Sequence, residues 1–362
     1  MLLRAVSSSI LLIGGCTERQ EAGALRSIEE VAFRQTESGL NASSRIVGQL
    51  QQPRRSPAVL RERNAALIVG GCKGKDSHLN SSERIQKIND QWKCEPAPLP
   101  NAVEGRSCAA FSNLDDSSGV IVGGFNGNDC LKSVELFKMN EKEVVSTTLE
   151  NIPFRIKNGV AVSVGDDSIL LFGGWDESHT TKAVFRLSFN KQHDSYHVDM
   201  ESILPYDVEG HCCAIHNGYV YIIGGYDGIS VLGTIIRYSI ADKKSEILPV
   251  RLSTPRENHV CEVVFDRYIV VMAGWDGKRA LDSVEVFEIV DEPPYLVPVS
   301  VNLKLAQDFA VGASGYDRDG TIGRAFLTFA NRVEPAMGFL DRNLYHSRLR
   351  ICARFKGITP RM

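Results

Sequence analysis

YVYIIGGYDGISVLGTIIRY, at residues 219–238, is the stretch that decides the fold. A run of β-branched and aromatic residues reaches the pair Gly224-Gly225 and turns at Tyr226-Asp227-Gly228. A second β-branched run then ends at Tyr238. Two such runs, separated by glycines and an Asp-Gly pair, predict a strand, a sharp turn and a second strand.

The same pattern returns along the chain at a regular spacing. It reads SSILLIGGC at 8–16, AALIVGGC at 65–72, SGVIVGGFNG at 118–127, DSILLFGGWDE at 167–177 and, with one glycine replaced, RYIVVMAGWDG at 267–277. By subtraction, the first residues of successive pairs are 56, 53, 50, 51 and 49 positions apart. A period of about 50 residues made of strands and turns is typical of a propeller blade. Units of this kind bury their faces by stacking on their neighbours.

Each unit holds four strand-like segments. In the unit around Gly123 they are 106–112, 118–124, 131–137 and 143–150. The sequence therefore predicts an all-β, six-bladed propeller with four antiparallel strands per blade. The blades are expected near residues 8–50, 54–100, 106–150, 157–203, 210–250 and 256–302. Glycine is needed where the chain turns sharply beside other strands, so we assign a structural role to Gly14, Gly15, Gly70, Gly71, Gly123, Gly124, Gly173, Gly174, Gly224, Gly225 and Gly274.

This pattern of an apolar run, paired glycines, an aromatic with Asp/Asn-Gly and a third strand resembles the kelch repeat. One copy also keeps a fourth-strand tryptophan, in INDQWKCEPAPLP at 88–100. The copies GGFNG…LKSVELF and AGWDG…LDSVEVF are most similar to the kelch domains of BTB–BACK–kelch proteins. The resemblance covers about residues 8–316. The other blades lack the fourth-strand tryptophan, and the last pair is Ala273-Gly274.

The two ends of the repeat region are expected to share a blade. The first unit has no room for an inner strand before Ser8, whereas QDFAVGASGYD at 307–317 matches the inner-strand position of GHCCAIHN at 210–217. We therefore expect residues 308–316 to close the first blade, as the resemblance also implies, because closure removes open sheet edges. Residues 318–362 form a basic C-terminal extension. It contains one strand-like segment, TIGRAFLTFA, and either packs on the propeller or is disordered.

Composition indicates a globular protein without affinity for polyanions. The chain has 43% hydrophobic and 23% charged residues, a net charge of −3 and a pI near 6.3. We therefore expect no nucleic-acid partner and, without an apolar run of about 18 residues, no membrane span.

MLLRAVSSSILLIGGC resembles a signal peptide, but LIVGGC recurs at 67–72, which favours a blade strand. Nine cysteines without a CxxC pair favour a reducing, cytoplasmic location.

No segment carries a signature of catalysis or metal binding. The densest group of metal-type ligands is His211, Cys212, Cys213 and His216. On a strand, 211 and 213 point to one face and 212 and 216 to the other, so they do not converge on one ion. No nucleophile elbow, phosphate loop or HExxH motif is present. We therefore expect a protein that is not an enzyme and has no metal or cofactor.

The candidate site is a face of the propeller. Large aromatics follow the paired glycines in units three to six, at Phe125, Trp175, Tyr226 and Trp275. The loops that lead into the inner strands reach the same rim and carry Arg54, Arg55, Arg106, Arg155, Lys157, Glu209, His211, Arg256 and Asn258. From these we select as partner-binding residues the four aromatics together with Arg106, Arg155, His211, Arg256 and Asn258. Arginines beside aromatics suit an acidic or phosphorylated peptide; packed aromatics and solvated turn residues are the alternative.

The expected function is therefore protein binding. The resemblance to BTB–BACK–kelch adaptors implies substrate recruitment to a cullin-RING ubiquitin ligase. The printed sequence contains no BTB or BACK region, so this role is implied for a longer form. Two alternatives stay open, because some kelch proteins bind actin and others are oxidases or sugar epimerases.

Overall fold

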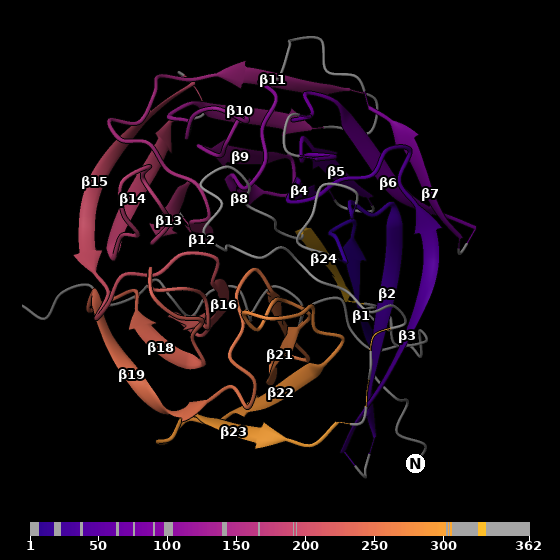
Figure 1. Cartoon of the computed structure of the whole chain (residues 1–362), viewed down its shortest axis with the longest axis vertical. Coiled ribbons are helices and arrows are strands. Elements are labelled where there is room, and N and C mark those ends of the chain that lie inside the picture. The colour runs from indigo at the N-terminus through magenta and orange to yellow at the C-terminus, as the bar shows by residue number, and fades with distance from the viewer. Residues whose placement is uncertain are drawn as a thin grey trace, which may run out of the picture. The chain divides into compact units, whose positions relative to one another are not determined.

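The computed structural model describes residues 7–305 and the backbone of 325–330, apart from gaps at 18–22, 37–38, 63–64, 75–76, 90, 98–103, 140–142, 166, 191, 193, 302 and 304. All of these residues belong to one compact unit, Met1–Asn331, and Arg332–Met362 form a second unit outside the description. The described strands of the first unit make six four-stranded antiparallel sheets, arranged around a central axis (Figure 1). This is the predicted six-bladed propeller.

The blades follow the order of the chain. Blade one contains β1 (Ser7–Ile13), β2 (Ser27–Thr36), β3 (Gly39–Gln49) and β24 (Ala325–Ala330); blade two β4 (Ala58–Arg61), β5 (Ala65–Val69), β6 (Ser82–Ile88) and β7 (Gln91–Pro96); blade three β8 (Ala110–Asp115), β9 (Ser118–Val122), β10 (Val134–Met139) and β11 (Val144–Thr148). Blade four contains β12 (Val160–Gly165), β13 (Ser168–Phe172), β14 (Ala183–Asn190) and β15 (Ser195–Ile203); blade five β16 (Cys212–His216), β17 (Tyr219–Ile223), β18 (Thr234–Ser239) and β19 (Lys244–Arg251); blade six β20 (Val260–Val264), β21 (Tyr268–Met272), β22 (Val284–Ile289) and β23 (Leu296–Val299).

The hydrophobic core lies in the seams between blades. In blade three, Ile121 of β9 packs with Leu67 of blade two, whereas its neighbour Val120 packs with Ile169 and Leu171 of blade four. Both faces of β9 are therefore buried, which explains why the second strands read as continuous apolar runs instead of alternating ones. Each of the six seams, including that between blades six and one, has a cluster of this kind.

The ring closes through a different segment from the one expected. β24 pairs antiparallel with β1, with Thr328 opposite Ile10, so the position assigned to residues 308–316 is taken by Ala325–Ala330. Residues 308–316 lie outside the described part of the chain. AFLTFA contains no glycine, whereas DFAVGASGY contains two, and interior glycines weaken a strand. Of the C-terminal extension expected over 318–362, only this strand is described.

The paired glycines are explained by contact between neighbouring blades. The second glycine of blades one to five donates its N–H to a carbonyl of the next blade, as Gly225 does to Arg256 at 2.8 Å. The first glycine lies against the same carbonyl. A Cβ on Gly173 would sit 2.2 Å from the Val208 oxygen, and one on Gly224 2.5 Å from the Arg256 oxygen. Both residues have positive φ, 54° and 59°, so sterics exclude larger residues in two independent ways.

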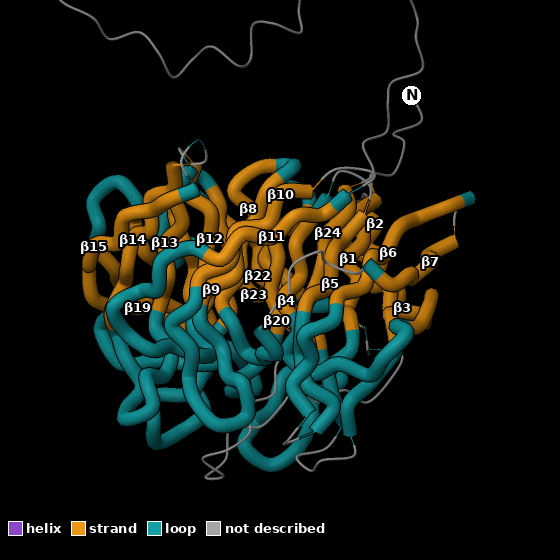
Figure 2. Tube along the Cα trace, turned by 90° about the horizontal axis from the view of Figure 1, so that it is seen from above, coloured by secondary structure: helices purple, strands orange, loops and turns teal. Residues whose placement is uncertain are grey.

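The loops between second and third strands gather on one side of the ring (Figure 2). We call this side the loop face. Within the described residues it includes the loops at 125–131, 175–181, 226–232 and 275–281. The connections into the first strands, at 54–56, 106–108, 156–158, 208–210 and 256–258, lie beside these loops, as the bridges Ser107–Phe125 and Lys157–Trp175 show. No helix in the described part of the chain has the length and apolar character needed to cross a bilayer.

Candidate binding face

A ring of left-handed residues surrounds the axis at the loop face. One residue of this kind precedes the first strand in each of blades two to six: Ser56 (φ 46°), Cys108 (58°), Asn158 (56°), Gly210 (59°) and Asn258 (50°). Their backbone groups join the blades. The N–H of Cys108 donates to the Ser56 carbonyl at 3.1 Å, Asn158 to Cys108 at 2.9 Å, Gly210 to Asn158 at 3.0 Å and Asn258 to Gly210 at 2.6 Å. Positive φ is uncommon outside glycine, and here it aims the amides of the last four residues at the preceding blade.

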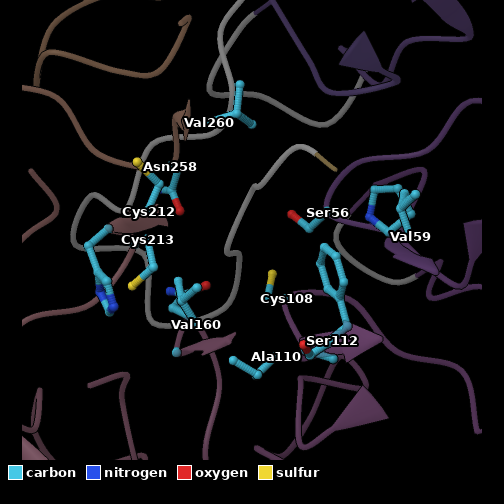
Figure 3. A pocket seen from close by; sticks show the side chains of 18 of the residues that line it. Ser56, Val59, Cys108, Ala110, Ser112, Val160, Cys212, Cys213, Asn258 and Val260 are labelled. Carbon is cyan, nitrogen blue, oxygen red and sulfur yellow. The ribbon is translucent and has the colours of Figure 1, made fainter. Parts of the chain in front are cut away.

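A cavity of about 320 Å³ lies inside this ring and between the first strands. Ser56, Cys108, Val160 and Ala110 surround the space in Figure 3. The wall is formed by β4, β8, β12, β16 and β20, and its lining includes apolar side chains and the thiols of Cys108, Cys212 and Cys213. His211 and Asn258, which the sequence assigned to the rim, line this cavity and are only 3% and 7% exposed.

The four aromatics of the loop face have two different environments. Phe125 and Trp275 are buried, at 3% and 7% exposure, whereas Trp175 and Tyr226 are half-buried. The Lys157 ammonium lies 4.2 Å from the Phe125 ring centroid and 4.5 Å from that of Trp175. It therefore stacks between the two rings and stabilises the seam between blades three and four. Trp175 and Tyr226 are the aromatics that remain accessible to a partner.

The arginines of the inner loops face inward. Arg54, Arg106 and Arg256 are at most 2% exposed. Each pairs with a glutamate of the third strand in its own blade: Arg54 with Glu83 at 2.8 Å, Arg256 with Glu285 at 2.7 Å, and Arg106 with Glu135. Each also donates to the carbonyl of the first residue of the paired-glycine site, as Arg106 does to Gly123 at 3.0 Å. The expectation that Arg106 and Arg256 line a binding rim is therefore corrected: they hold each blade to its incoming loop.

Arg155 is the one residue of the predicted arginines that reaches solvent. Its side chain is 39% exposed and lies 3.5 Å from Glu177 and 4.0 Å from Asp129. It also donates to the Cys130 carbonyl at 2.5 Å. Glu177 accepts from the Cys130 amide at 2.6 Å, so both charges are already engaged at the junction of blades three and four.

Comparison with known proteins agrees with this geometry. Residues 2–225 match the family described as the KLHDC2/KLHL20/DRC7 Kelch-repeats domain, and residues 209–249 match the Kelch motif. The chain belongs to this kelch-repeat family. The structure titled "Structure of YjhT" has a TM-score of 0.60 at 13% identity and covers 80% of this chain and 97% of its own. At this identity it supports the fold alone. The search of curated proteins gives no significant match.

The position of the buried arginine–glutamate pair is filled in two ways: blades two, three and six have the ion pair, and blades four and five have apolar side chains. In blade four, Ile156 and Phe185 replace the pair, and Phe185 stacks on Phe154 with ring centroids 4.1 Å apart. In blade five, Val208 and Ile236 occupy the same two positions in one apolar cluster. Because a buried ion pair and a well-packed apolar pair of similar volume have similar net stability, either solution supports a blade.

The group of metal-type ligands at residues 211–216 is divided between two seams of the kelch propeller. Cys212 belongs to the core between blades five and six, and Cys213 packs against the core between blades four and five. Burial raises the pKa of both thiols well above the ordinary value and lowers the pKa of His211 to about 3. All three side chains are therefore neutral. Among the described residues, no three metal-type ligands are grouped around one point.

Sequence reasoning missed the glutamates and found the arginines for the wrong reason. A usable signal was present, because subtraction of the residue numbers gives the same spacing for Arg54–Glu83, Arg106–Glu135 and Arg256–Glu285. An arginine and a glutamate that recur together in a repeat indicate a pair within the repeat. The apolar replacements in blades four and five change both positions at once, which supports the same conclusion.

Proposed function

We propose that this kelch propeller is a protein-interaction module that binds a polypeptide segment on the loop face, over blades four and five. The observation that carries the proposal is the pair of half-buried aromatics, Trp175 and Tyr226, at equivalent positions of adjacent blades. Aromatic side chains give large contact areas at a small entropic cost and are enriched in binding hot spots. Kelch-repeat propellers are in general protein-interaction modules.

Both aromatics stand on a rigid frame. The backbone of Trp175 exchanges hydrogen bonds of 2.8 and 3.0 Å with Lys157, and that of Tyr226 exchanges bonds of 2.8 and 2.9 Å with Glu209. Glu209 is itself fixed, since it accepts from Asn158 at 2.8 Å and from Thr180 at 3.1 Å. A site held by such supporting contacts loses little conformational freedom on binding.

The same contacts favour binding over catalysis. Burial raises the pKa of Glu209, against the hydrogen bonds from Asn158 and Thr180. Glu209 is 6% exposed and its carboxyl group joins two blades, so it is not placed to exchange protons with a substrate. His211 is neutral and buried. Glu209 acts as a structural partner and His211 is buried within the fold, and we propose that the protein is not an enzyme.

A more specific role is recruitment of a substrate protein to a cullin-RING ubiquitin ligase. This proposal rests on the resemblance of the best repeats to BTB–BACK–kelch adaptors and on the kelch-repeat family match. In that arrangement the propeller holds the substrate, and the ligase contacts belong to the BTB and BACK parts.

Selection from a random 12-residue peptide library displayed on phage tests the binding role. The full chain is immobilised, and enriched peptides are measured against the double variant Trp175→Ala/Tyr226→Ala and against Tyr226→Ala alone. We expect the double variant to lose at least tenfold in affinity, since about 1.4 kcal/mol of lost contact gives that factor. The matched control is Met200→Ala on the outer strand β15, where the side chain is 64% exposed. Unchanged peptide binding by both aromatic variants, with melting temperatures near wild type, would refute the proposal.

A further inference from the structure

The four loops between second and third strands in blades three to six share one tightly built turn. An Asn or Asp side chain accepts hydrogen bonds from the amides two and three residues later: Asn126 at 3.0 and 2.9 Å, Asp176 at 2.9 and 3.0 Å, Asp227 at 2.8 and 2.7 Å, and Asp276 at 2.8 and 2.8 Å. The fold therefore fixes the backbone of each tip and leaves the tip side chains to other uses.

The tip side chains differ sharply between blades. The equivalent positions carry Asn128, Ser178, Ile229 and Lys278 in blades three to six. Ile229 is 85% exposed. The six other exposed large apolar residues of the described chain all lie in strands and are less exposed: Ile46, Met200, Ile203, Ile215, Ile247 and Val297. Ile229 therefore contributes almost nothing to the core, although a polar residue serves the same turn in three blades.

Two exposed cations lie on the neighbouring tip of blade six. Lys278 is exposed and makes no ion pair within the described residues. The Arg279 side chain is 81% exposed and lies 3.8 Å from Asp276, a weak contact. The two tips are neighbours, since a Cβ on Gly277 would lie 3.5 Å from the Cγ2 atom of Val231, which follows Ile229 by two residues.

We propose that the tips of blades five and six bind a polypeptide segment in which an apolar residue is flanked by acidic residues. The apolar residue contacts Ile229 beside Tyr226, and the acidic side chains face Lys278 and Arg279. Charge complementarity selects this occupant, because two exposed cations border the apolar tip and an acidic segment satisfies both. This inference rests on the proposed binding role and names the class of segment that the face takes.

The contribution of each group follows from its exposure. Ile229 gains free energy by leaving water, and burying an isoleucine gives a change of about tenfold or more in affinity. Exposed cations contribute less to affinity and more to the choice between acidic and basic partners. The pattern of selected sequences is therefore a sharper readout of the cations than the affinity of one peptide.

The test repeats the phage selection on the full wild-type chain and on Lys278→Glu/Arg279→Glu. Wild type should enrich peptides with an apolar residue next to Asp or Glu, and the charge-reversed variant should enrich Lys or Arg at those positions. Ile229→Ser, which places the blade-four residue at this tip, should weaken the wild-type peptides about tenfold. Matched controls on the outer strand β19 are Ile247→Ser, at 48% exposure, and Lys244→Glu, which should leave both pattern and affinity unchanged.

Each outcome decides between the two proposals. Identical peptide patterns from the wild type and the charge-reversed variant, or full affinity in Ile229→Ser, overturn this inference. If Trp175→Ala/Tyr226→Ala still abolishes binding in that case, the proposed binding role stands on its own. If the tip variants lose binding but the aromatic variant does not, the contact is on the tips and the aromatic site is wrong. No enrichment above empty beads counts against both.

Discussion

Replacing the buried Arg256–Glu285 pair of blade six by its blade-five equivalents is the sharpest test of how these blades are held together. The Glu285 carboxylate lies 2.7 Å from the Arg256 guanidinium, which is 0% exposed. Glu285→Ile alone leaves a buried cation without its anion, and arginine does not escape the cost by losing its proton. Breaking a buried pair in this way costs about 3–5 kcal/mol.

Changing both partners should recover most of that loss. Arg256→Val/Glu285→Ile reproduces Val208 and Ile236, which already pack together in the core of the seam between blades four and five. We expect the double variant to lie within about 2 kcal/mol of wild type, because buried ion pairs and apolar pairs of similar volume are nearly equivalent. The residual cost comes from two sources. The amides of Ser253 and Thr254, which donate to Glu285 at 2.7 and 3.1 Å, must then bond to water, and the Ala273 carbonyl loses the hydrogen bond from Arg256 at 2.9 Å.

Urea unfolding, followed by tryptophan fluorescence, measures the effect in wild type, in the single variants Arg256→Val and Glu285→Ile, and in the double variant. The expected result is a low midpoint for Glu285→Ile and a midpoint close to wild type for the double variant, with similar m-values. A double variant as unstable as Glu285→Ile would refute the reasoning, since the stability would then depend on the ion pair itself. A harmless single variant would refute it equally, because it would mean that the buried cation finds other compensation.

Three further predictions use other parts of the fold. Gly224→Ala should lower the free energy of unfolding by about 3 kcal/mol or more, because the strain of a left-handed backbone adds to the clash of a Cβ placed 2.5 Å from the Arg256 oxygen. Gly165→Ala, at a φ of 82° with no atom within 4 Å of the new Cβ, should lower it by only about 1 kcal/mol. Equal melting temperatures of the two variants would contradict this. His211 has a folded pKa of about 3, below the unfolded value of 6.5, so the unfolded chain binds more protons and stability falls as pH drops from 6.5 towards 3. His211→Asn should reduce the loss between pH 7 and pH 5 by about 2 kcal/mol in urea midpoints, and an unchanged loss would show that His211 does not titrate as inferred. Lys157→Met should weaken the seam between blades three and four by about 1–2 kcal/mol and change Trp175 fluorescence, whereas Lys182→Met, an exposed change on the same blade, should do neither.

Much of the architecture is readable from local pattern. The glycine pairs, the apolar second strands and their regular spacing predicted six four-stranded blades, and the structure has them. The prediction succeeds because each blade repeats one set of steric demands, such as the Gly224 turn beside the next blade. Strand boundaries were less accurate: β8 begins at Ala110 instead of 106, since residues before it form the link between blades.

Other features required the tertiary structure. The sequence placed Arg106 and Arg256 on a rim, and only the fold shows that each meets a glutamate of the third strand inside its own blade. It favoured 308–316 as the closing strand, but β24 pairs with β1. It treated four aromatics alike, whereas the folded chain buries Phe125 and Trp275 and leaves Trp175 and Tyr226 only half-buried.

The division has one physical cause. Backbone geometry and strand periodicity are set by neighbouring residues, so one chain reports them without knowledge of the whole. The exposure of a side chain depends on residues that are distant along the chain, such as the glutamate of the same blade that meets Arg106 or the Lys157 of the next blade that covers Phe125. The repeat therefore determined the scaffold, and tertiary contacts within and between blades decided which residues remain accessible for binding.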